Sequence, residues 1–443
     1  MPALKKKVLI ITYYFPPSGG AGVQRTLRFL NNLSQLGWES VILTVRNGDY
    51  PTIDNSLIKK VPPQTSIYRT FIPEPYSLYR KFTGRKIGEA IDLSTLSIDE
   101  QGTVSLKEKI AIFLRTWLFI PDARIGWFPF AFFKGLRVIR KEKIDLVFST
   151  GPPNTVHIIA GALKFVTGKK WVADFRDPWF KYLVPKRNSI IPLKIDSALN
   201  KLVLNHADSL TWVCEGIKKE TEKTSGIKIQ TKNIIITNGF NELDFENLPS
   251  NSSNKFILTY VGSLFVRYDL TCFIRAIENI YSKHTNFRED LEMVFYGTVD
   301  SDVEMKFRNS EFHQNIRFMG YQNHKQTLTN MVSSTLLLLY IIDSPQGKNI
   351  PTSKLFEYIG AKRPILALAP QDSEAARIIN KTKSGIIIQP DDSITIEKEV
   401  LFLYQQWSRS KQLVLDYDTN AIKQFEIKNL TKRMVDVWDA NLD

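Results

Sequence analysis

Residues 335–360 read TLLLLYIIDSPQGKNIPTSKLFEYIG. The apolar run 335–342 predicts a buried strand, and a polar loop at 347–353 follows it. A helix is predicted from about residue 353 to residue 360, where a glycine ends it. A buried strand, a polar loop and a helix form the repeating unit of parallel sheets, so this stretch indicates an α/β fold.

The start of this predicted helix suits an anion. A helix N-terminus offers unpaired N–H groups and a partial positive charge. Lys354 adds a mobile cation, and Glu357, one turn later, offers a carboxylate that can hold a ribose diol. These parts favour a nucleotide-diphosphate site. A second interpretation is a capped helix with Ser353 as its N-cap, and local chemistry leaves both open.

Strands and helices alternate along the rest of the chain. In the first half, the predicted strands are 8–12, 40–45, 145–149, 170–174, 209–213 and 233–237, and the predicted helices are 21–36, 107–119, 128–141, 154–167, 188–207 and 214–224. In the second half, the predicted strands are 256–261, 291–296, 316–319, 335–342, 364–368 and 385–388. Further helices are predicted at 394–408 and 419–440. Residues 48–105 form a long proline-rich region without this alternation.

The alternation predicts two doubly wound, Rossmann-like domains that face a cleft, with the ligand at the carboxyl ends of the strands. We expect an N-terminal domain at 1–246, including the irregular insertion 48–105, and a C-terminal domain at 254–418. The Ser- and Asn-rich stretch 247–255 has the composition of a linker.

Charge and cysteine content narrow the class of protein. The net charge is +14 over 443 residues, which favours anionic partners such as phospholipid surfaces or nucleotides. No zinc-finger, RRM or KH signature is found, so a nucleic-acid partner is not expected. Only Cys214 and Cys272 occur, which fits a reducing cytosol. Four apolar residues at 8–11 are too few for a signal peptide, and no run reaches the ~18 of a membrane span.

Two glycine-rich loops follow predicted strands. Residues 15–25 read FPPSGGAGVQR, which brings Gly20 and Gly22 to the start of a helix. This is not the dinucleotide fingerprint, because Arg25 stands in place of its third glycine. Residues 260–269 read YVGSLFVRYD, where Gly262 ends a strand and Arg267 could pair with a diphosphate. Either loop alone is equally well explained by a turn.

Six segments in order resemble the retaining glycosyltransferases of family 4, which have the GT-B fold, in the subgroup with an Arg-Asp-Pro-Trp motif. The segments are YYFPPSGGAGVQR (13–25), STGPPNTVH (149–157), VADFRDPW (172–179), ITNGF (236–240), YVGSLFVRYD (260–269) and SKLFEYIGAKRPILAL (353–368). The resemblance implies sugar transfer from a UDP- or GDP-type nucleotide-sugar to a glycan or lipid-linked acceptor in cell-envelope polysaccharide synthesis. It also implies a C-terminal nucleotide-sugar domain and a final helix, within 419–443, that crosses back to the N-terminal domain.

The resemblance assigns donor-binding residues by position. Glu357 matches the second Glu of the family's pair, which holds the ribose, and the first Glu corresponds to Asn349. The segment that meets the donor phosphates comprises Ser353, Lys354 and Leu355. The family's pair of basic phosphate contacts corresponds to Arg267 and Ser263, next to Gly262. The loop facing the reaction centre contains Gly20 and Gly22.

The catalytic predictions follow from the same resemblance, whereas the metal prediction follows from the residues themselves. The family often has a His after the fifth strand of the first domain, and this chain has Arg176 and Asp177 instead. Asp177 is predicted at the reaction centre, or as a turn residue, and Arg176 as an anion contact. We expect His157 to be a packed helix residue. Asp300 and Asp302 form a D-x-D triplet that is better explained by a helix start, so no metal and no cofactor are predicted.

Aromatic and basic residues alternate at 110–120 (IAIFLRTWLFI), 127–133 (WFPFAFF) and 134–141 (KGLRVIRK). This pattern suits a lipid headgroup interface, and it suits the packing of two helices equally well. A cytoplasmic enzyme is expected, with an anionic inner-membrane surface as a candidate partner. Two alternatives stay open: a nucleotide-sugar epimerase of the same architecture, and a non-catalytic membrane-binding relative.

Overall fold

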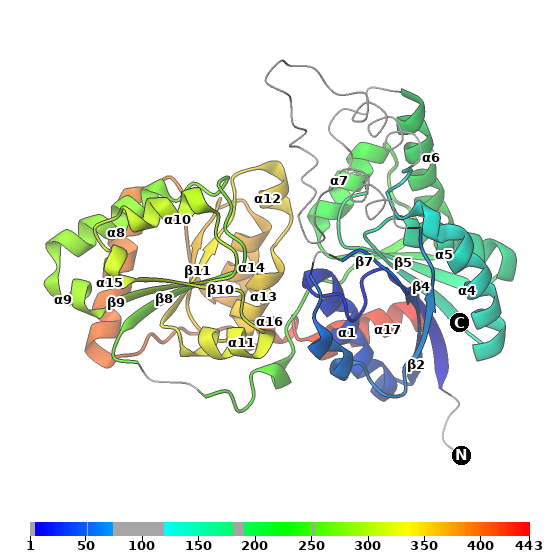
Figure 1. The fold of residues 1–443 in the computed structure, drawn as a ribbon, viewed down its shortest axis with the longest axis horizontal. Helices are drawn as coiled ribbons and strands as arrows, with labels where there is room; N and C mark the ends of the chain where they lie inside the picture. Colours follow the sequence, from blue (N-terminus) through cyan, green and yellow to red (C-terminus); the bar gives the residue numbers. More distant parts are fainter. Residues whose placement is uncertain (1–4, 51, 74–118, 180–189, 250–252) are drawn as a thin grey trace. The chain divides into compact units, whose positions relative to one another are not determined.

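The computed structural model describes residues 5–50, 52–73, 119–179, 190–249 and 253–443. The chain divides into two compact units (Figure 1). The N-terminal unit comprises Met1–Thr237 and Thr431–Asp443, and the C-terminal unit comprises Asn238–Leu430. The predicted helix at 107–119, except for its last residue, and the irregular stretch 74–105 lie outside the described residues.

The N-terminal unit contains a parallel sheet of seven strands in the order β3-β2-β1-β4-β5-β6-β7. Their bounds are β1 (Lys6–Ile11), β2 (Trp38–Val45), β3 (Ser66–Thr70), β4 (Leu146–Gly151), β5 (Lys170–Phe175), β6 (Ser209–Trp212) and β7 (Lys232–Ile235). Six of these strands confirm the sequence prediction. The interpretation of 48–105 as irregular was wrong at β3, whose short sequence SIYRT lacks an apolar run and becomes a strand by pairing with β2.

Helices cover both faces of this sheet. They are α1 (Ala21–Leu33), α4 (Phe128–Glu142), α5 (Thr155–Thr167), α6 (Ile190–His206), α7 (Glu215–Ser225) and the C-terminal part of α17 (Ile427–Asp439). Helices α4, α5, α6 and α7 contact one another in succession and therefore form one layer. Right-handed crossovers place α1 on the opposite face, because the connection from β1 to β2 runs against the direction of the later connections. Helix α17 packs on the sheet through Trp438, which contacts β2 and β4.

The end of the chain returns to the N-terminal unit. The Trp438 ring packs against Trp38 and Phe148 at centroid distances of 5.2 and 5.3 Å. The single helix predicted at 419–440 was wrong, because α16 (Thr419–Lys423) and α17 are separate. The backbone of Phe240 bonds to both Phe425 and Ile427 between them, and these bonds replace helical ones.

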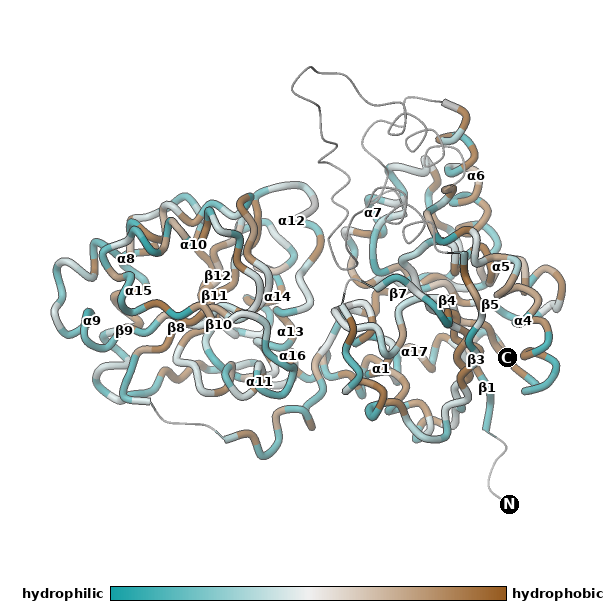
Figure 2. The backbone as a smooth tube through the Cα atoms, in the orientation of Figure 1, coloured by the Kyte–Doolittle hydropathy of each residue, from teal (hydrophilic) through white to brown (hydrophobic). Residues whose placement is uncertain are grey.

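The C-terminal unit contains a parallel sheet of six strands in the order β10-β9-β8-β11-β12-β13. The strands are β8 (Phe256–Val261), β9 (Leu291–Tyr296), β10 (Ile316–Gly320), β11 (Leu336–Tyr340), β12 (Ile365–Leu368) and β13 (Gly385–Ile388), and all six confirm the prediction. The strands are hydrophobic along most of their length (Figure 2) because helices cover them. The helices of the C-terminal unit are α8 (Thr271–Lys283), α9 (Thr285–Asp290), α10 (Ser301–Arg308), α11 (His324–Ser333), α12 (Pro345–Asn349), α13 (Ser353–Gly360), α14 (Glu374–Thr382), α15 (Ser393–Ser410) and α16.

The strand order reverses once in each unit. The reversal lies between β1 and β4 in the N-terminal sheet and between β8 and β11 in the C-terminal sheet. Connections leave such a point in opposite directions, so the carboxyl ends of the two strands border a crevice that typically binds ligands. Both glycine-rich loops of the sequence follow the first of these strands.

A buried ion pair fixes α1 to the N-terminal sheet. Arg25 donates from Nε and Nη2 to the two oxygens of Asp174 at 3.1 and 2.9 Å. The same guanidinium donates to the carbonyls of Ile236 and Thr237 at 2.8 Å. Thr150 and Thr211 donate to Asp174 as well. Burial alone would raise the pKa of Asp174, but Arg25 and the hydroxyls outweigh burial, and the pKa lies below its ordinary value.

We predict that Asp174→Asn lowers the free energy of unfolding by about 3–5 kcal/mol, because Arg25 keeps a buried charge without its counter-ion. The matched control is Glu39→Gln, since Glu39 pairs with Lys7 at 3.6 Å on the surface of the same unit. This control should cost under about 1 kcal/mol. Urea titrations of both variants test the prediction, and equal losses would contradict it.

Candidate functional site

The loop after β8 lies at the strand reversal of the C-terminal sheet. Gly262 has a φ of +121°, which L side chains rarely adopt. A Cβ on Gly262 would also lie 2.8 Å from the Nζ of Lys354. The position therefore needs a glycine for its backbone conformation and for the close approach of a cation.

Lys354 reaches this loop from the first turn of α13. Its ammonium donates to the Tyr260 hydroxyl at 2.7 Å and lies 4.2 Å from the centroid of the Tyr260 ring. Tyr260 in turn donates to the Ser263 carbonyl at 2.9 Å. Burial lowers the pKa of Lys354 to about 7. An ammonium with this pKa is short of a counter-charge, and an anion in the crevice would supply one.

Helix α13 begins beside this ammonium. Its N-cap is Thr352 rather than Ser353, and no side chain caps it. The interpretation of Ser353 as the N-cap was therefore wrong, because the extended backbone that precedes the helix is that of Thr352. Leu355 is fully buried, so only its backbone could meet a ligand. Ser353 is exposed at the helix start.

Glu357 lies one turn further along α13 and is partly exposed. Its Oε1 lies 3.2 Å from Nε2 of His324, at the start of α11. His324 could not be predicted as a partner of Glu357, because 33 residues separate the two and a lone histidine carries no local signal. The role of Tyr260 could not be predicted either, because it depends on contacts with Lys354 and Ser263.

The other predicted donor-binding residues are more exposed. Arg267 is exposed, and its guanidinium carbon lies 5.3 Å from the Phe265 ring centroid. Ser263 is exposed in the same loop, and Asn349 is exposed at the end of α12. This short helix occupies part of the segment that was predicted as a loop, and a Ser344 hydroxyl that accepts the Gly347 N–H supports it. Thus the structure brings Gly262, Ser263 and Lys354 together. Gly262 lies against the Lys354 ammonium, and the Tyr260 hydroxyl bonds to both Lys354 and the Ser263 carbonyl.

In the N-terminal unit, the predicted residues meet at the carboxyl ends of β1, β4 and β5. Gly20, with a φ of +85°, is the N-cap of α1. Arg176 donates to the carbonyl of Gly22, and also to the carbonyls of Gly151 and Pro152 at 3.0 and 2.7 Å. Its guanidinium therefore ties the start of α1 to the end of β4. Asp177 follows it and is partly buried.

His157 is confirmed as a packed residue. Its side chain is fully buried, and its ring stacks on Phe175 at a centroid distance of 4.6 Å. Its Nδ1 lies 2.8 Å from the Ser149 hydroxyl, which accepts from Trp171. Burial lowers the pKa of His157 to about 3, so the ring is neutral at physiological pH.

The D-x-D triplet supports the loop after β8. The Oδ2 of Asp300 accepts the Val266 N–H at 2.9 Å, and the Asp300 N–H donates to the Leu264 carbonyl at 2.9 Å. Asp300 is also the N-cap residue of α10, although its side chain makes no capping bond. Within the described part of the chain, no three His, Cys, Asp or Glu side chains gather into a group that could hold a metal ion.

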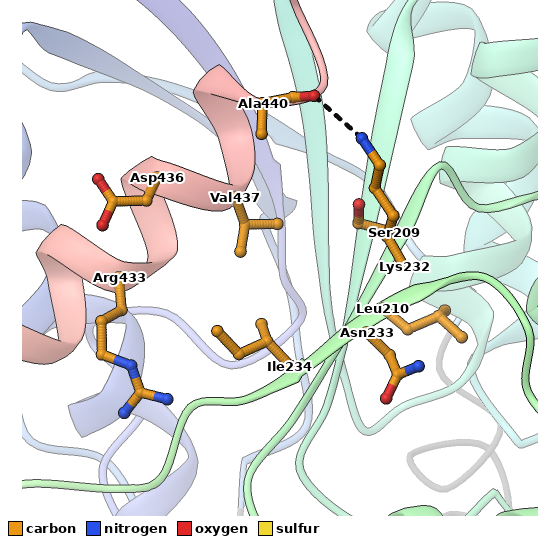
Figure 3. A pocket seen from close by; sticks show the side chains of 9 residues that line it. All are labelled: Ser209, Leu210, Lys232, Asn233, Ile234, Arg433, Asp436, Val437 and Ala440. Carbon is orange, nitrogen blue, oxygen red and sulfur yellow. Dashed lines mark hydrogen bonds between the residues drawn. The ribbon is translucent and has the colours of Figure 1, made fainter.

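A separate hollow of about 250 Å³ lies in the N-terminal unit, between β6, β7 and α17 (Figure 3). Its walls include Ile234 and Val437, and Lys232 donates across it to the Ala440 carbonyl at 3.4 Å. None of the predicted site residues lines it.

Comparisons with known proteins identify the fold. No protein-family model matches the chain, and no curated protein sequence is significantly similar to it. A glycosyltransferase structure from Rickettsia africae is similar over 99% of each chain, at 14% identity and a TM-score of 0.61. Anabaena HepE in complex with UDP is similar over 98% of this chain and 100% of its own, at 11% identity and a TM-score of 0.58.

A third similar structure is a putative UDP-N-acetylglucosamine 2-epimerase from Listeria monocytogenes, with 14% identity, 98% and 96% coverage and a TM-score of 0.53. These similarities and the two Rossmann-like sheets confirm the predicted GT-B type of α/β fold. At such identities they show the fold alone. The predicted cleft and the roles of the site residues stay predictions.

We predict that Asp300→Ala loosens the loop after β8, because the Val266 N–H loses its acceptor. The loss of one such bond costs about 1 kcal/mol, or about fivefold faster exchange of the Val266 amide. The matched control is Asp302→Ala, an exposed residue of the same triplet. Hydrogen exchange measures both variants, and a Val266 amide that is equally protected in the two would contradict the assignment.

Proposed function

We propose that this chain is a glycosyltransferase that uses a UDP- or GDP-type nucleotide-sugar. The observation that carries the proposal is the Lys354 ammonium, held against Gly262 at the strand reversal of the C-terminal unit. A diphosphate there would meet a cation, the uncapped N-terminus of α13 and a backbone without a Cβ. Proteins of this fold include a UDP complex, which makes a nucleoside diphosphate the first ligand to test.

Glu357 would hold the ribose of this donor. A carboxylate can accept hydrogen bonds from both hydroxyls of a diol, and Glu357 lies one helical turn from Lys354. His324 contacts Glu357 at 3.2 Å and would act as a positioning residue for the carboxylate. Arg267 and Asn349 are exposed and would complete the site from the loop after β8 and from the end of α12.

We propose retention without a metal ion. When the bond between the sugar C1 and the diphosphate breaks, negative charge develops on the departing oxygen. Lys354 and the α13 amides would stabilise this charge. An acceptor hydroxyl would form the new bond from the same face, and its proton would go to the departing phosphate. Asp177 is the proposed reaction-centre residue of the N-terminal unit, and Arg176 positions the loops around it.

The acceptor we propose is a glycan or a lipid-linked glycan of the cell envelope, modified in the cytoplasm. The support is the sequence resemblance, because an acceptor cannot be named from the donor site. Among the described residues, no helix has the length and apolar character needed to cross a bilayer.

A second candidate function is nucleotide-sugar epimerisation, favoured by the similarity to the Listeria structure. Incubation of the protein with UDP- and GDP-sugars alone discriminates the two, because an epimerase needs no acceptor. Proton NMR of the sugar anomeric signal should show no new isomer if the chain is a transferase. Appearance of an epimer at catalytic rates would replace the proposal.

We predict that UDP or GDP raises the melting temperature of the protein, since ligand at a hundredfold excess over Kd stabilises it by about 2.7 kcal/mol.

Lys354→Met should weaken binding of both the nucleotide and inorganic diphosphate by about tenfold or more, because a charge-assisted contact is lost. Glu357→Ala should weaken the nucleotide by about tenfold and leave inorganic diphosphate unchanged, because diphosphate has no ribose.

The matched control is Lys398→Met, which removes an exposed lysine from α15. It should bind both ligands as the wild type does. A wild-type protein with no thermal shift for any nucleotide would instead favour a non-catalytic relative. If Glu357→Ala weakened the binding of inorganic diphosphate as much as the binding of the nucleotide, the ribose assignment would be wrong.

A further inference from the structure

The outer surface of α4, α5 and α6 combines exposed apolar side chains with cations. These helices form one layer of the N-terminal unit. The exposed apolar residues include Phe133 and Phe165, whose side chains are 62% and 92% exposed. The others that we assign to this surface are Phe130, Ile191, Ile195 and Leu202, and Val166 next to Phe165 is exposed as well. The exposed cations are Arg137, Arg140, Lys141, Lys194 and Lys201. We call these eleven residues the α4–α6 face.

The α4–α6 face carries no exposed acid. The three helices contain only two acids, Glu142 and Asp196, and both take part in hydrogen bonds within the unit. Glu142 accepts from the Tyr68 hydroxyl. Asp196 is buried and accepts from Trp179 Nε1 at 2.8 Å. The face is therefore uniformly cationic between its apolar side chains.

The pattern on α6 is that of an amphipathic interfacial helix. Ile191, Ile195 and Leu202 recur along one side of the helix, and Lys194 and Lys201 lie beside them. Figure 2 shows the mixture of apolar and polar residues along α6. The inward side contains Asp196 and Asn200, which are buried. This helix therefore presents an apolar stripe to solvent rather than to the core, which is unusual for a soluble protein.

Other helices of the unit lack this pattern. The exposed residues of α7 are Lys219, Lys223 and Thr224, and those of α17 within this unit are Lys432, Arg433 and Asp436. Neither α1, α7 nor α17 has a large exposed apolar side chain among the described residues. Net positive charge alone, which is spread over the chain, does not explain the α4–α6 face.

We propose that the α4–α6 face docks on an anionic lipid bilayer. Phe, Ile and Leu would enter the boundary between headgroups and acyl chains, while Lys and Arg pair with anionic headgroups. The chemistry favours a bilayer over a nucleic acid, which offers phosphates but no hydrocarbon for these side chains. The proposal rests on the proposed function in one respect: the bilayer would hold the lipid-linked acceptor of the proposed glycosyltransferase.

Co-sedimentation with vesicles tests the proposal on the full chain. The vesicles contain phosphatidylcholine alone or with 30% phosphatidylglycerol, at 0.1 M NaCl. One variant combines Phe133→Ser with Phe165→Ser, and a second combines Arg137→Glu with Lys201→Glu. The matched control is Lys428→Glu with Lys432→Glu, two exposed lysines of α17. The control changes the net charge by the same amount as the second variant.

The wild type should sediment with anionic vesicles and not with phosphatidylcholine alone. Both face variants should lower the partition coefficient about tenfold or more. The charge variant loses two cations, each of which contributes about fivefold near an anionic surface. The Phe variant loses the side chains that would enter the boundary of the acyl chains. The control should lower it less than about threefold. Nucleotide-induced thermal shifts without vesicles should be the same in all four proteins. These shifts show that the variants fold, and they report on the proposed function separately.

Three results would overturn the proposal. The first is absence of the wild type from the pellet with anionic vesicles. The second is an equal loss in the control and in the face variants, which would indicate a response to net charge. The third is self-association of the wild type in light scattering that the Phe133 and Phe165 substitutions abolish, which would make the face an interface between copies.

Discussion

The proposed donor site of the C-terminal unit depends on Lys354, an ammonium whose charge is poorly solvated because its side chain is partly buried. The strand order reverses between β8 and β11, and the connections diverge there. The β8 connection begins with Gly262, and the β11 connection leads through α12 to α13, which carries Lys354. Tyr260 accepts a hydrogen bond from the ammonium, but a neutral hydroxyl supplies no counter-charge. Burial therefore lowers the Lys354 pKa to about 7, and an anion bound nearby would raise this pKa again.

In the N-terminal unit, Arg25 and Arg176 are bound by protein groups instead. Arg25 is neutralised by Asp174, and its remaining donors bind backbone carbonyls at the end of the unit. Arg176 donates to three carbonyls, one at the start of α1 and two at the end of β4. Both guanidiniums therefore hold backbone in place around the glycine-rich loop. Within the described residues, the C-terminal unit contains the partly buried Lys354, and the N-terminal unit contains the hydrogen bonds of Arg176 next to Asp177.

The sequence predicted most strands because parallel strands that are covered on both faces are continuous apolar runs, as in β8 and β11. The β3 strand was missed because an edge strand needs little apolar character and depends on its neighbour. The break between α16 and α17 was missed for a similar reason. Its cause is the backbone of Phe240, about 185 residues earlier in the chain, and no local pattern can report such a contact.

In the candidate site too, residues with a local sequence pattern could be predicted, and contacts between distant residues could not. Lys354 and Gly262 could be selected from the sequence, because a lysine at a helix start and a glycine after a strand have local signatures. Their contact through Tyr260, and the pairing of Glu357 with His324, depend on which strands become neighbours. The inward placement of Glu142 and Asp196, which leaves the α4–α6 face without exposed acids, also depends on tertiary contacts. The packed state of His157 was predictable, because its helical neighbours are apolar.

The most direct test of the account is the number of protons taken up when UDP or GDP binds at pH 8.5. Calorimetry in two buffers with different ionisation enthalpies measures this number. A lysine whose pKa rises from about 7 toward its ordinary value on meeting a diphosphate should take up about one proton per ligand at this pH. The uptake should persist in Lys398→Met. Binding with equal heats in the two buffers would show that the nucleotide does not neutralise Lys354, and it would contradict the account.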